Sequence, residues 1–195
     1  MAKIKLTKNE LKAQRDSLKR FQRYLPTLQL KKQQLQMEIR KLEQEIINKR
    51  KEEEQKRSDL NSWIYLYSDD FNLLNYLKIQ ELKTSRGNIA GVNIPILENL
   101  IFNEKIPDLF NTPLWIDEGI NVLKKLMQLR VERKIMEEQH KLLAEELRTT
   151  TQRVNLFEKV KIPEAKENIR IIRIFMGDQQ TAAVARSKIA KGKSE

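Results

Sequence analysis

The chain has 195 residues, of which 39% are hydrophobic and 33% charged, and its formal net charge is +11. It contains no cysteine and one histidine, which excludes disulfides, thiolate metal sites and any centre that needs two histidines. No segment has the ~20 apolar residues that a membrane-spanning helix needs. A charge-rich chain of this kind is typical of a coiled coil, in which only two positions in seven are buried.

The first predicted element is a long helix, assigned to residues 1–68. Its apolar residues recur at steps of three and four, which places them in one narrow seam that a second helix must cover. The seam comprises Ile4, Leu11, Leu18, Phe21, Leu25, Leu28, Leu35, Ile39, Leu42, Ile46, Leu60 and Trp63. Pro26 removes a backbone hydrogen bond at a cost of about 3 kcal/mol, but the seam keeps its phase on both sides. We expect a kinked, continuing helix, with a break into two helices as the alternative.

The central segment, residues 69–114, is predicted to be an insertion. Phe71, Leu74 and Leu77 have the spacing of a short helical piece. Residues 86–95 then combine turn formers with β-branched residues, which indicates a β-hairpin or an irregular loop. An insertion of this length allows the second long helix to return antiparallel to the first.

The second long helix is assigned to residues 115–190, and residues 191–195 to a disordered tail. Its apolar ladder comprises Val122, Leu126, Leu129, Met136, Leu143, Leu147, Val154 and Phe157. We expect Ile171 and Phe175 to rejoin this ladder beyond Pro163. The predicted fold class is therefore mainly all-α: a long antiparallel two-helix coiled coil with a short central insertion, in which a β-hairpin is one alternative.

Several ladder positions hold polar residues, which weaken a coiled coil but fix its register. They are Lys32, Lys49, Glu53 and Lys56 on the first helix and Arg133, His140, Thr150 and Lys161 on the second. The alternative is that another subunit covers the helices at these positions. The acidic runs 52–54 and 137–138 lie among Lys and Arg, which is typical of an ion-paired helix face rather than of a catalytic carboxylate pair. The sequence predicts no catalytic centre, metal site or cofactor site.

The charge is unevenly distributed along the chain. Its sum is +9 over residues 1–57, −4 over residues 61–119 and +7 over residues 120–195. Such polarity can steer a protein toward acidic surfaces, although a solvated helix surface explains any single cluster equally well. Nucleic-acid binding is disfavoured because acidic residues alternate with the basic ones and aromatic residues are few.

Two motifs are more specific than the heptad pattern. Residues 149–163, TTTQRVNLFEKVKIP, resemble the threonine–Arg-Val-Asn-x-x-Glu…Ile-Pro signature of the D subunit of V-type and archaeal-type rotary ATPases. Residues 88–95, NIAGVNIP, are similar to that family's Asn-(Ile/Val)-x-Gly-Val-x-(Val/Ile)-Pro segment. A weaker element, LQLKKQQL at residues 28–35, is similar to the family's Leu-Lys-x-Lys-Arg-Asp-x-Leu with three substitutions. Residues 178–186 keep little of the acidic, Phe-containing end that the family usually has.

The resemblance implies a non-catalytic rotor subunit of the central stalk, without cofactor or metal. In that family both long helices reach into the hexamer of catalytic A and B subunits. A small F subunit packs beside the coil, and the lower end rests on the subunit that caps the membrane rotor ring. We expect these partners here, in a cytoplasmic complex peripheral to the membrane, with neither membrane insertion nor nucleic-acid binding. The alternatives are a coiled-coil scaffold without nucleotide-linked partners and a basic coiled coil that binds nucleic acid.

The two motifs also supply candidate site residues. Candidates for contact with other subunits are Arg153, Val154, Asn155 and Glu158. Candidates for a regulatory loop are Asn88, Gly91, Val92 and Pro95. The alternative interpretations are packing within the coil for the first set and a plain hairpin connection for the second.

Overall fold

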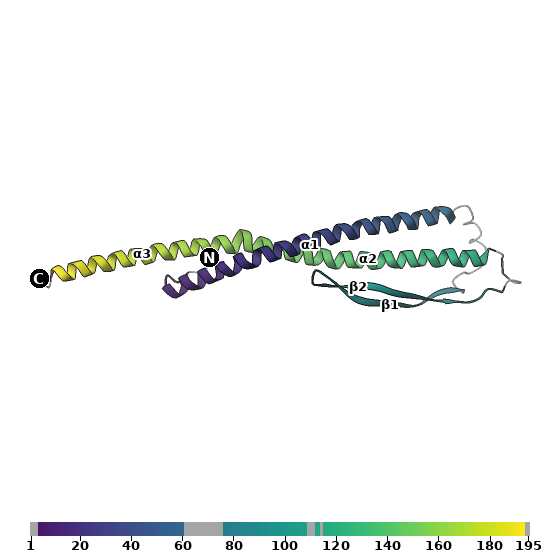
Figure 1. Ribbon diagram of the computed structural model, residues 1–195, viewed down its shortest axis with the longest axis horizontal. Coiled ribbons are helices and arrows are strands. Elements are labelled where there is room, and N and C mark those ends of the chain that lie inside the picture. The colour runs from purple at the N-terminus through teal and green to yellow at the C-terminus, as the bar shows by residue number, and fades with distance from the viewer. Residues whose placement is uncertain (1–3, 61–75, 109–111, 114, 194–195) are drawn as a thin grey trace. The chain divides into compact units, whose positions relative to one another are not determined.

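The computed structural model describes residues 4–60, 76–108, 112–113 and 115–193 (Figure 1). Its elements in chain order are α1 (Lys8–Leu60), β1 (Leu77–Ile89), β2 (Val92–Glu104), α2 (Ile116–Leu156), the π-helical turn η3 (Phe157–Lys161) and α3 (Ile162–Gly192). The predicted fold class is confirmed: two long helical segments flank a central hairpin. Trp63 and the predicted short helical piece at Phe71 and Leu74 lie outside the described residues.

The chain divides into two compact units, and each contains part of both long helical segments. Unit 1 consists of residues 1–33 and 148–195, and unit 2 consists of residues 34–147. Within the described ranges, no helix is both long and apolar enough to span a membrane. The described residues also contain no group of three or more His, Cys, Asp or Glu side chains placed to hold a metal ion.

Helix α1 continues through Pro26. The helix begins with a hydrogen bond from the Glu10 amide to Thr7 Oγ1 at 3.3 Å, the first half of a capping box. The side chain of Pro26 is exposed and lies off the seam, so its ring does not interfere with packing between helices. The predicted alternative, a break into two helices, is therefore wrong.

The seam of α1 follows the predicted ladder from Leu11 to Glu53, whereas Lys56, the next predicted ladder position, is exposed. Each step of three or four from Leu11 to Glu53 falls on a buried or half-buried side chain. These side chains are Leu11, Gln14, Leu18, Phe21, Leu25, Leu28, Lys32, Leu35, Ile39, Leu42, Ile46, Lys49 and Glu53. The polar ladder positions Lys32, Lys49 and Glu53 thus belong to the same face as the leucines.

In unit 2, α1 and α2 pair antiparallel around a small apolar core. Glu43 on α1 contacts His140 on α2, and Glu53 contacts Arg133, so the partner number falls as the α1 number rises. The buried members of this core are Leu35, Ile39, Leu42, Ile94 and Leu143. Because Ile94 belongs to β2, the hairpin contributes to the core between the two helices.

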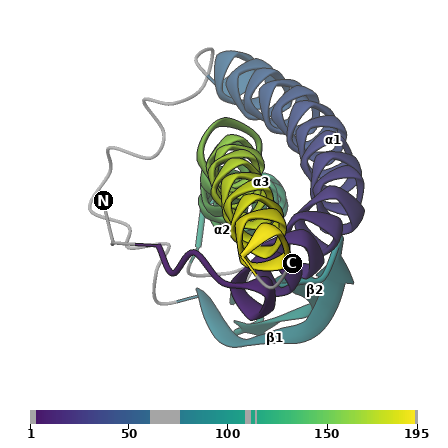
Figure 2. The same ribbon diagram turned by 90° about the vertical axis from the view of Figure 1, so that its left-hand side faces the viewer.

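The hairpin forms a third layer of unit 2, beside α2 (Figures 1 and 2). Strands β1 and β2 pair antiparallel from Leu77↔Glu104 to Ile89↔Val92, and two bulges leave Gln80 and Glu98 without partners. The strands are longer than the turn region that the sequence indicated. Leu77, which we expected in a short helical piece, is instead the first residue of β1. Its side chain is fully buried against α2, and this packing favours the strand at that position.

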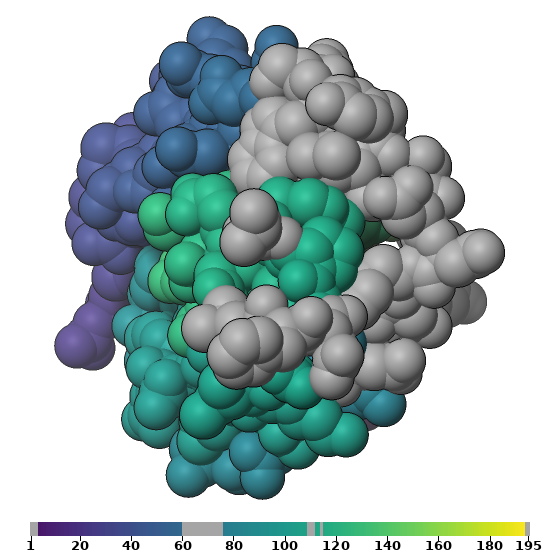
Figure 3. Space-filling model, turned by 90° about the vertical axis from the view of Figure 1, so that its right-hand side faces the viewer, coloured from purple at the N-terminus to yellow at the C-terminus, as the bar shows by residue number. Residues whose placement is uncertain are grey.

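Helix α2 is buried on two faces, whereas its sequence ladder predicted only the face toward α1. A second core joins Leu77 of β1 to Ile116 and Ile120 of α2. Phe102 of β2 packs against the same cluster. Figure 3 shows the start of α2 between the blue part of α1 and the teal hairpin.

In unit 1, the N-terminal part of α1 packs against η3 and α3. The rings of Phe21 and Phe157 lie 5.3 Å apart, and the side chains of Gln14 and Asn168 are 3.4 Å apart. Helix α3 extends to Gly192, so residues 191 and 192, which we expected in the disordered tail, belong to its last turn. The domain boundaries drawn from the sequence stay predictions.

The apolar face of α3 differs from the predicted one. Ile171 and Phe175, which we expected on the ladder, are 39% and 37% exposed. Ala165, Ile169 and Ile172 are buried instead. The expectation for Ile171 and Phe175 is therefore wrong, and the reason lies in the π-helical turn that precedes α3.

Candidate functional site

The tip of the hairpin is a two-residue turn. Ala90 and Gly91 both have positive φ angles, 51° and 81°, as the tight hairpin turn that matches the twist of the strands requires. The Asn88 side chain accepts a hydrogen bond from the Gly91 amide at 3.0 Å and donates one to Asn93 Oδ1 at 3.1 Å. Asn88 and Gly91, two of the predicted regulatory residues, therefore build the turn itself.

The tip is docked on the coiled coil of unit 2. The Ile94 side chain is 4% exposed in the core between α1 and α2, and Val92 packs against that core. The Pro95 carbonyl accepts a hydrogen bond from the Gln139 side chain of α2. Val92 and Pro95, the other two predicted regulatory residues, thus attach the hairpin to the helices.

Gly87 allows the strands to pack closely near the tip. A Cβ atom at this position would lie 2.3 Å from Cδ1 and 2.9 Å from Cγ1 of Ile96, both inside van der Waals contact. Gly87 pairs with Ile94, the buried residue of the docked tip. The side chain of Ile96 fills the space that a side chain at Gly87 would occupy.

A cluster of ion pairs links the two helices of unit 2. Arg133 donates hydrogen bonds to Glu53 at 3.0 Å and to Glu137 at 2.6 Å, and hydrogen bonding to Glu137, followed by Glu53, raises the pKa of Arg133. Lys49 lies 2.9 Å from Glu132, and that hydrogen bond raises the pKa of Lys49. Three ladder positions that the sequence predicted as polar therefore hold cross-helix ion pairs.

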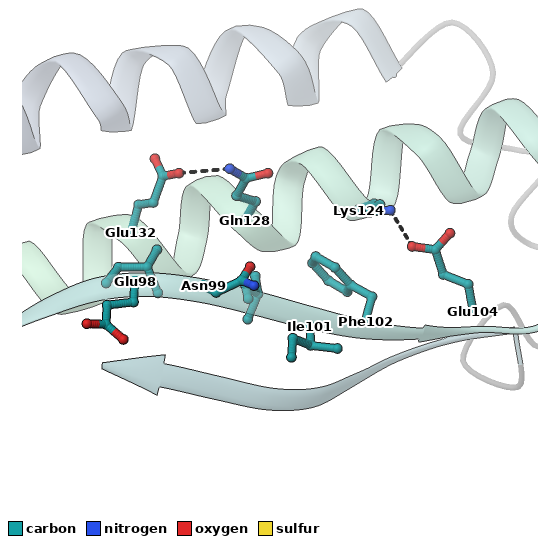
Figure 4. Close-up of a pocket in the computed structure, with 10 residues that line it drawn as sticks. Glu98, Asn99, Ile101, Phe102, Glu104, Lys124, Gln128 and Glu132 are labelled. Carbon is teal, nitrogen blue, oxygen red and sulfur yellow. Dashed lines mark hydrogen bonds and ion pairs between the residues drawn. The ribbon is translucent and has the colours of Figure 1, made fainter. Parts of the chain in front are cut away.

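A shallow groove of about 580 Å³ runs between β2 and α2 (Figure 4). Lys124 of α2 forms an ion pair with Glu104 at one end of the groove and lies 5.5 Å above the Phe102 ring. At the other end, Gln128 donates a hydrogen bond to Glu132 at 3.1 Å. Of these two pairs, Lys124 with Glu104 joins β2 to α2, whereas Gln128 and Glu132 both belong to α2.

The second motif, residues 149–163, lies in unit 1 and has one buried and one exposed face. Val154 is 4% exposed and Thr150 is 1% exposed, so both pack in the interior of the coil. Arg153, Asn155 and Glu158 are exposed. Of the four predicted contact residues, Val154 thus has a packing role, and the other three lie on the surface of the helix.

The same motif contains the π-helical turn η3. The Ile162 amide donates to the Phe157 carbonyl, five residues earlier, and Pro163 follows directly at the start of α3. Leu156 and Val160 are 44% and 48% exposed, so the turn presents two apolar side chains among Arg153, Glu158 and Lys159. The sequence signal for this turn was Pro163, across which we expected the ladder of a single helix to resume unchanged.

Antiparallel helices joined by cross-helix ion pairs, with a hairpin docked on α2, define a coiled-coil protein. Comparison with known proteins identifies the family. Residues 10–192 match the family described as the D subunit of ATP synthase. The chain is 52% identical over 191 residues to the V-type ATP synthase D subunit of Borreliella burgdorferi, and the match covers 98% of this chain and 95% of the relative.

More distant relatives agree. The V-type ATP synthase D subunits of Chlamydia caviae and Chlamydia muridarum are 34% and 35% identical, each over 98% of this chain, and over 94% and 96% of their own lengths. The chain therefore belongs to the ATP synthase D-subunit family. The resemblance drawn from its two motifs is confirmed.

Some residues that hold the site together were missed from the sequence. Gln139 lies on α2 between ladder positions, and nothing in the sequence pattern connects it with Pro95. Gly87 lies among the turn formers of residues 86–95, and nothing in that pattern shows that a side chain at this position of β1 would meet Ile96 of β2. The pairing of Glu53 with Arg133 could have been derived, because both were predicted polar ladder positions of opposite charge.

Proposed function

We propose that the protein is the non-catalytic rotor subunit in the central stalk of a V/A-type ATPase, transmitting torque between the A/B hexamer and the membrane ion-translocating ring. The observation that carries this proposal is the match to the D-subunit family over nearly the whole chain. The catalytic A and B subunits, the small F subunit and the subunit that caps the rotor ring are the proposed partners. The complex is cytoplasmic and peripheral to the membrane.

The physics of the coiled coil supports a torque-bearing role. A rotor changes the state of surrounding subunits only if it contacts them differently in each orientation, because equal contacts would shift no equilibrium. It must also resist sliding of one helix along the other. The ion pairs of Glu53 with Arg133 and of Lys49 with Glu132 oppose such sliding, because a shift of one residue would separate both pairs.

Within this role, Arg153, Asn155 and Glu158 are the proposed contact residues of unit 1. Their exposure leaves them available to a partner, and they lie beside the exposed apolar side chains of Leu156 and Val160. Val154 supports them from the interior, since it holds this segment against the coil.

The hairpin tip is proposed to regulate the assembled enzyme. Its attachment to α2 through Ile94 and Gln139 supports a role as a fixed contact surface rather than as a free loop. A variant should therefore alter the exposed side of the tip without opening the core. Replacing Asn93 by Ala meets this condition, since the side chain is exposed and its neighbour Asn88 keeps the turn bond to Gly91.

Co-expression with the A, B and F subunits of the same organism tests the main proposal. Gentle purification followed by mass spectrometry should recover this chain with all three subunits. A stable homodimer that captures none of them would favour the scaffold alternative instead. Binding to DNA or RNA that weakens steeply with salt would favour the nucleic-acid alternative.

The contact residues are tested in the recovered complex. Arg153→Ala and Asn155→Ala should lower the ATPase rate or the coupling to ion transport while the circular dichroism spectrum stays unchanged. Arg148→Ala is the matched control, since it replaces another exposed arginine of α2 outside the Arg-Val-Asn segment. Equal effects of Arg153→Ala and Arg148→Ala would contradict a specific role for the motif.

A further inference from the structure

The buried face of unit 1 slips by one residue between α2 and α3. Continued from Val154 in steps of three and four, the ladder would reach positions 157, 161, 164, 168, 171 and 175. The structure instead buries Ala165, Ile169 and Ile172 and half-buries Met176. Each of these four positions comes one residue later than the ladder predicts, and of the predicted positions 164, 168, 171 and 175 only Asn168 is half-buried.

The partner helix shows no such slip. The ladder of α1 keeps its steps of three and four from Leu11 to Glu53, across Pro26. The extra residue therefore belongs to the second helical segment alone, at a point between Val154 and Ala165.

The π-helical turn lies within that interval. In an α-helix each amide donates to the carbonyl four residues earlier, whereas the Ile162 amide donates to Phe157, five residues earlier. A π turn therefore encloses one residue more than an α turn. One extra residue in the turn accounts for a slip of one residue in the buried face.

Pro163 fixes where the extra residue is placed. It has no amide hydrogen, and inside a continuous α-helix its ring would clash with the carbonyl of residue 159. At the first turn of α3 both problems are reduced, because first-turn amides need no partner within their own helix. On the opposite side, the Phe157 ring packs 5.3 Å from Phe21 and holds the start of the turn against α1.

We propose that η3 is a one-residue insertion that sets the register of α3 against α1 and thereby selects which face of α3 is buried. With the turn present, the row Ala165, Ile169 and Ile172 packs in the coil. The alternative row, which contains Ile171 and Phe175, remains on the surface. This register-setting role is independent of the function proposed for the assembled enzyme.

Two single-residue deletions in the full-length chain test the proposal. Deleting Lys159 removes the extra residue, so the helix can become regular while Ile169 and Ile172 stay on the buried face. Deleting Lys166 removes a lysine that is likewise exposed from regular α-helix, which rotates Ile169 and Ile172 by about 100° off that face. Both deletions remove one residue and one positive charge.

The measurement is thermal unfolding. We expect the Lys159 deletion to change Tm by less than about 2 °C and the Lys166 deletion to lower it by about 5–10 °C. A Lys166 deletion that changes Tm by no more than the Lys159 deletion's expected limit of about 2 °C would overturn the proposal. If both deletions lower Tm equally, the Lys159 deletion is repeated with Pro163→Ala, because the proline alone could prevent a regular helix. A loss in that variant equal to the loss in the Lys166 deletion would also overturn the proposal.

Cross-linking reads the register directly. Because the chain has no cysteine, Gln14→Cys with Asn168→Cys introduces the only two thiols, at side chains that are 3.4 Å apart. A short bifunctional thiol reagent should join them in the parent and in the Lys159 deletion, but at least tenfold less in the Lys166 deletion. Loss of the cross-link in the Lys159 deletion would contradict the proposed register.

Discussion

Arg133 on α2 donates a hydrogen bond from Nε to Glu53 Oε2 on α1 across 3.0 Å, and the two residues are 80 positions apart in the chain. Both side chains are largely covered, with 18% and 12% of their surfaces exposed. The pair occupies the seam, where leucine would pack better. Its contribution is therefore to fix how the two helices are aligned along each other. A shifted coil would leave two charges partly buried and unpaired, which is costly.

Replacing Glu53 by Gln should lower the free energy of unfolding by about 1–2 kcal/mol, because the covered Arg133 loses one charged partner and keeps only Glu137. Urea denaturation followed by circular dichroism measures the change. Glu52→Gln is the control, since Glu52 is 53% exposed and should cost less than about 0.5 kcal/mol. Equal costs for the two variants would argue against a specific cross-helix pair.

The attachment of the hairpin predicts a large difference between two isoleucines of β2. Ile94→Ala should cost about 2–4 kcal/mol, because its side chain is buried in the core between α1 and α2. Ile96→Ala should cost less than about 1.5 kcal/mol, since 43% of that residue is exposed. Comparable costs in equilibrium unfolding would mean that the tip is not docked.

Gly87→Ala should lower the free energy of unfolding by about 1 kcal/mol or less, because its Cβ would overlap the end of the Ile96 side chain, which is 43% exposed and can shift. Adding Ile96→Ala removes both clashing atoms, so the double variant should recover part of the loss. A double-mutant cycle by urea denaturation measures this coupling. Strictly additive effects of the two substitutions would refute the close contact.

Pro26→Ala should stabilise the protein by about 1 kcal/mol or more. It restores an amide donor within α1 without disturbing the seam, since the proline side chain is exposed. Thermal unfolding checks the sign. A lower Tm would show that the local geometry around the proline is required for packing in unit 1.

The ion pair of Lys49 predicts a dependence on alkaline pH. The hydrogen bond to Glu132 raises the pKa of Lys49 above its usual 10.5, so the folded state holds the proton more tightly than the unfolded state. This contribution to stability is complete below about pH 10.5 and is lost as the pH rises through the folded-state pKa.

Melting temperatures measured between about pH 9 and about pH 12 should therefore fall more steeply for the parent than for a Glu132→Gln variant. The comparison cancels the titration of the other lysines and tyrosines, which both proteins share. Parallel curves would show that the pair contributes nothing to folding.

The sequence predicted the structure best where a single pattern determines which residues are buried. The ladder of α1 could be predicted as far as Glu53, including the polar positions Lys32 and Lys49, because α1 buries a single face; Lys56, also predicted on the ladder, is exposed. The turn at the tip of the hairpin could also be predicted, because Asn88 and Gly91 are residue types that favour turns. The full length of the two strands could not be predicted, because packing on α2 stabilises β1 and β2 more than any alternation of apolar and polar residues in their own sequences.

The slip of α3 shows why periodicity failed at one point. A ladder extrapolated across Pro163 assumes that every turn holds the same number of residues, and η3 violates that assumption. Ile171 and Phe175 are as apolar as the residues that are buried, so composition could not choose between the two rows. Of the candidate contact residues, Val154 could be placed in the interior from the ladder, whereas the exposure of Arg153, Asn155 and Glu158 followed from their positions off it.

The docked tip also bears on the order in which the chain folds. The hairpin joins residues at most 27 positions apart and its contact with Gln139 of α2 spans 44, whereas Glu53 and Arg133 close a loop of 80. Closing a long loop costs more chain entropy than closing a short one. The hairpin on α2 therefore offers a preformed surface, with Ile94 at its tip, onto which the distant segment of α1 can fold. The hairpin, which is a side layer of the coil in the folded protein, would thus form early in folding and serve as the template on which unit 2 is assembled.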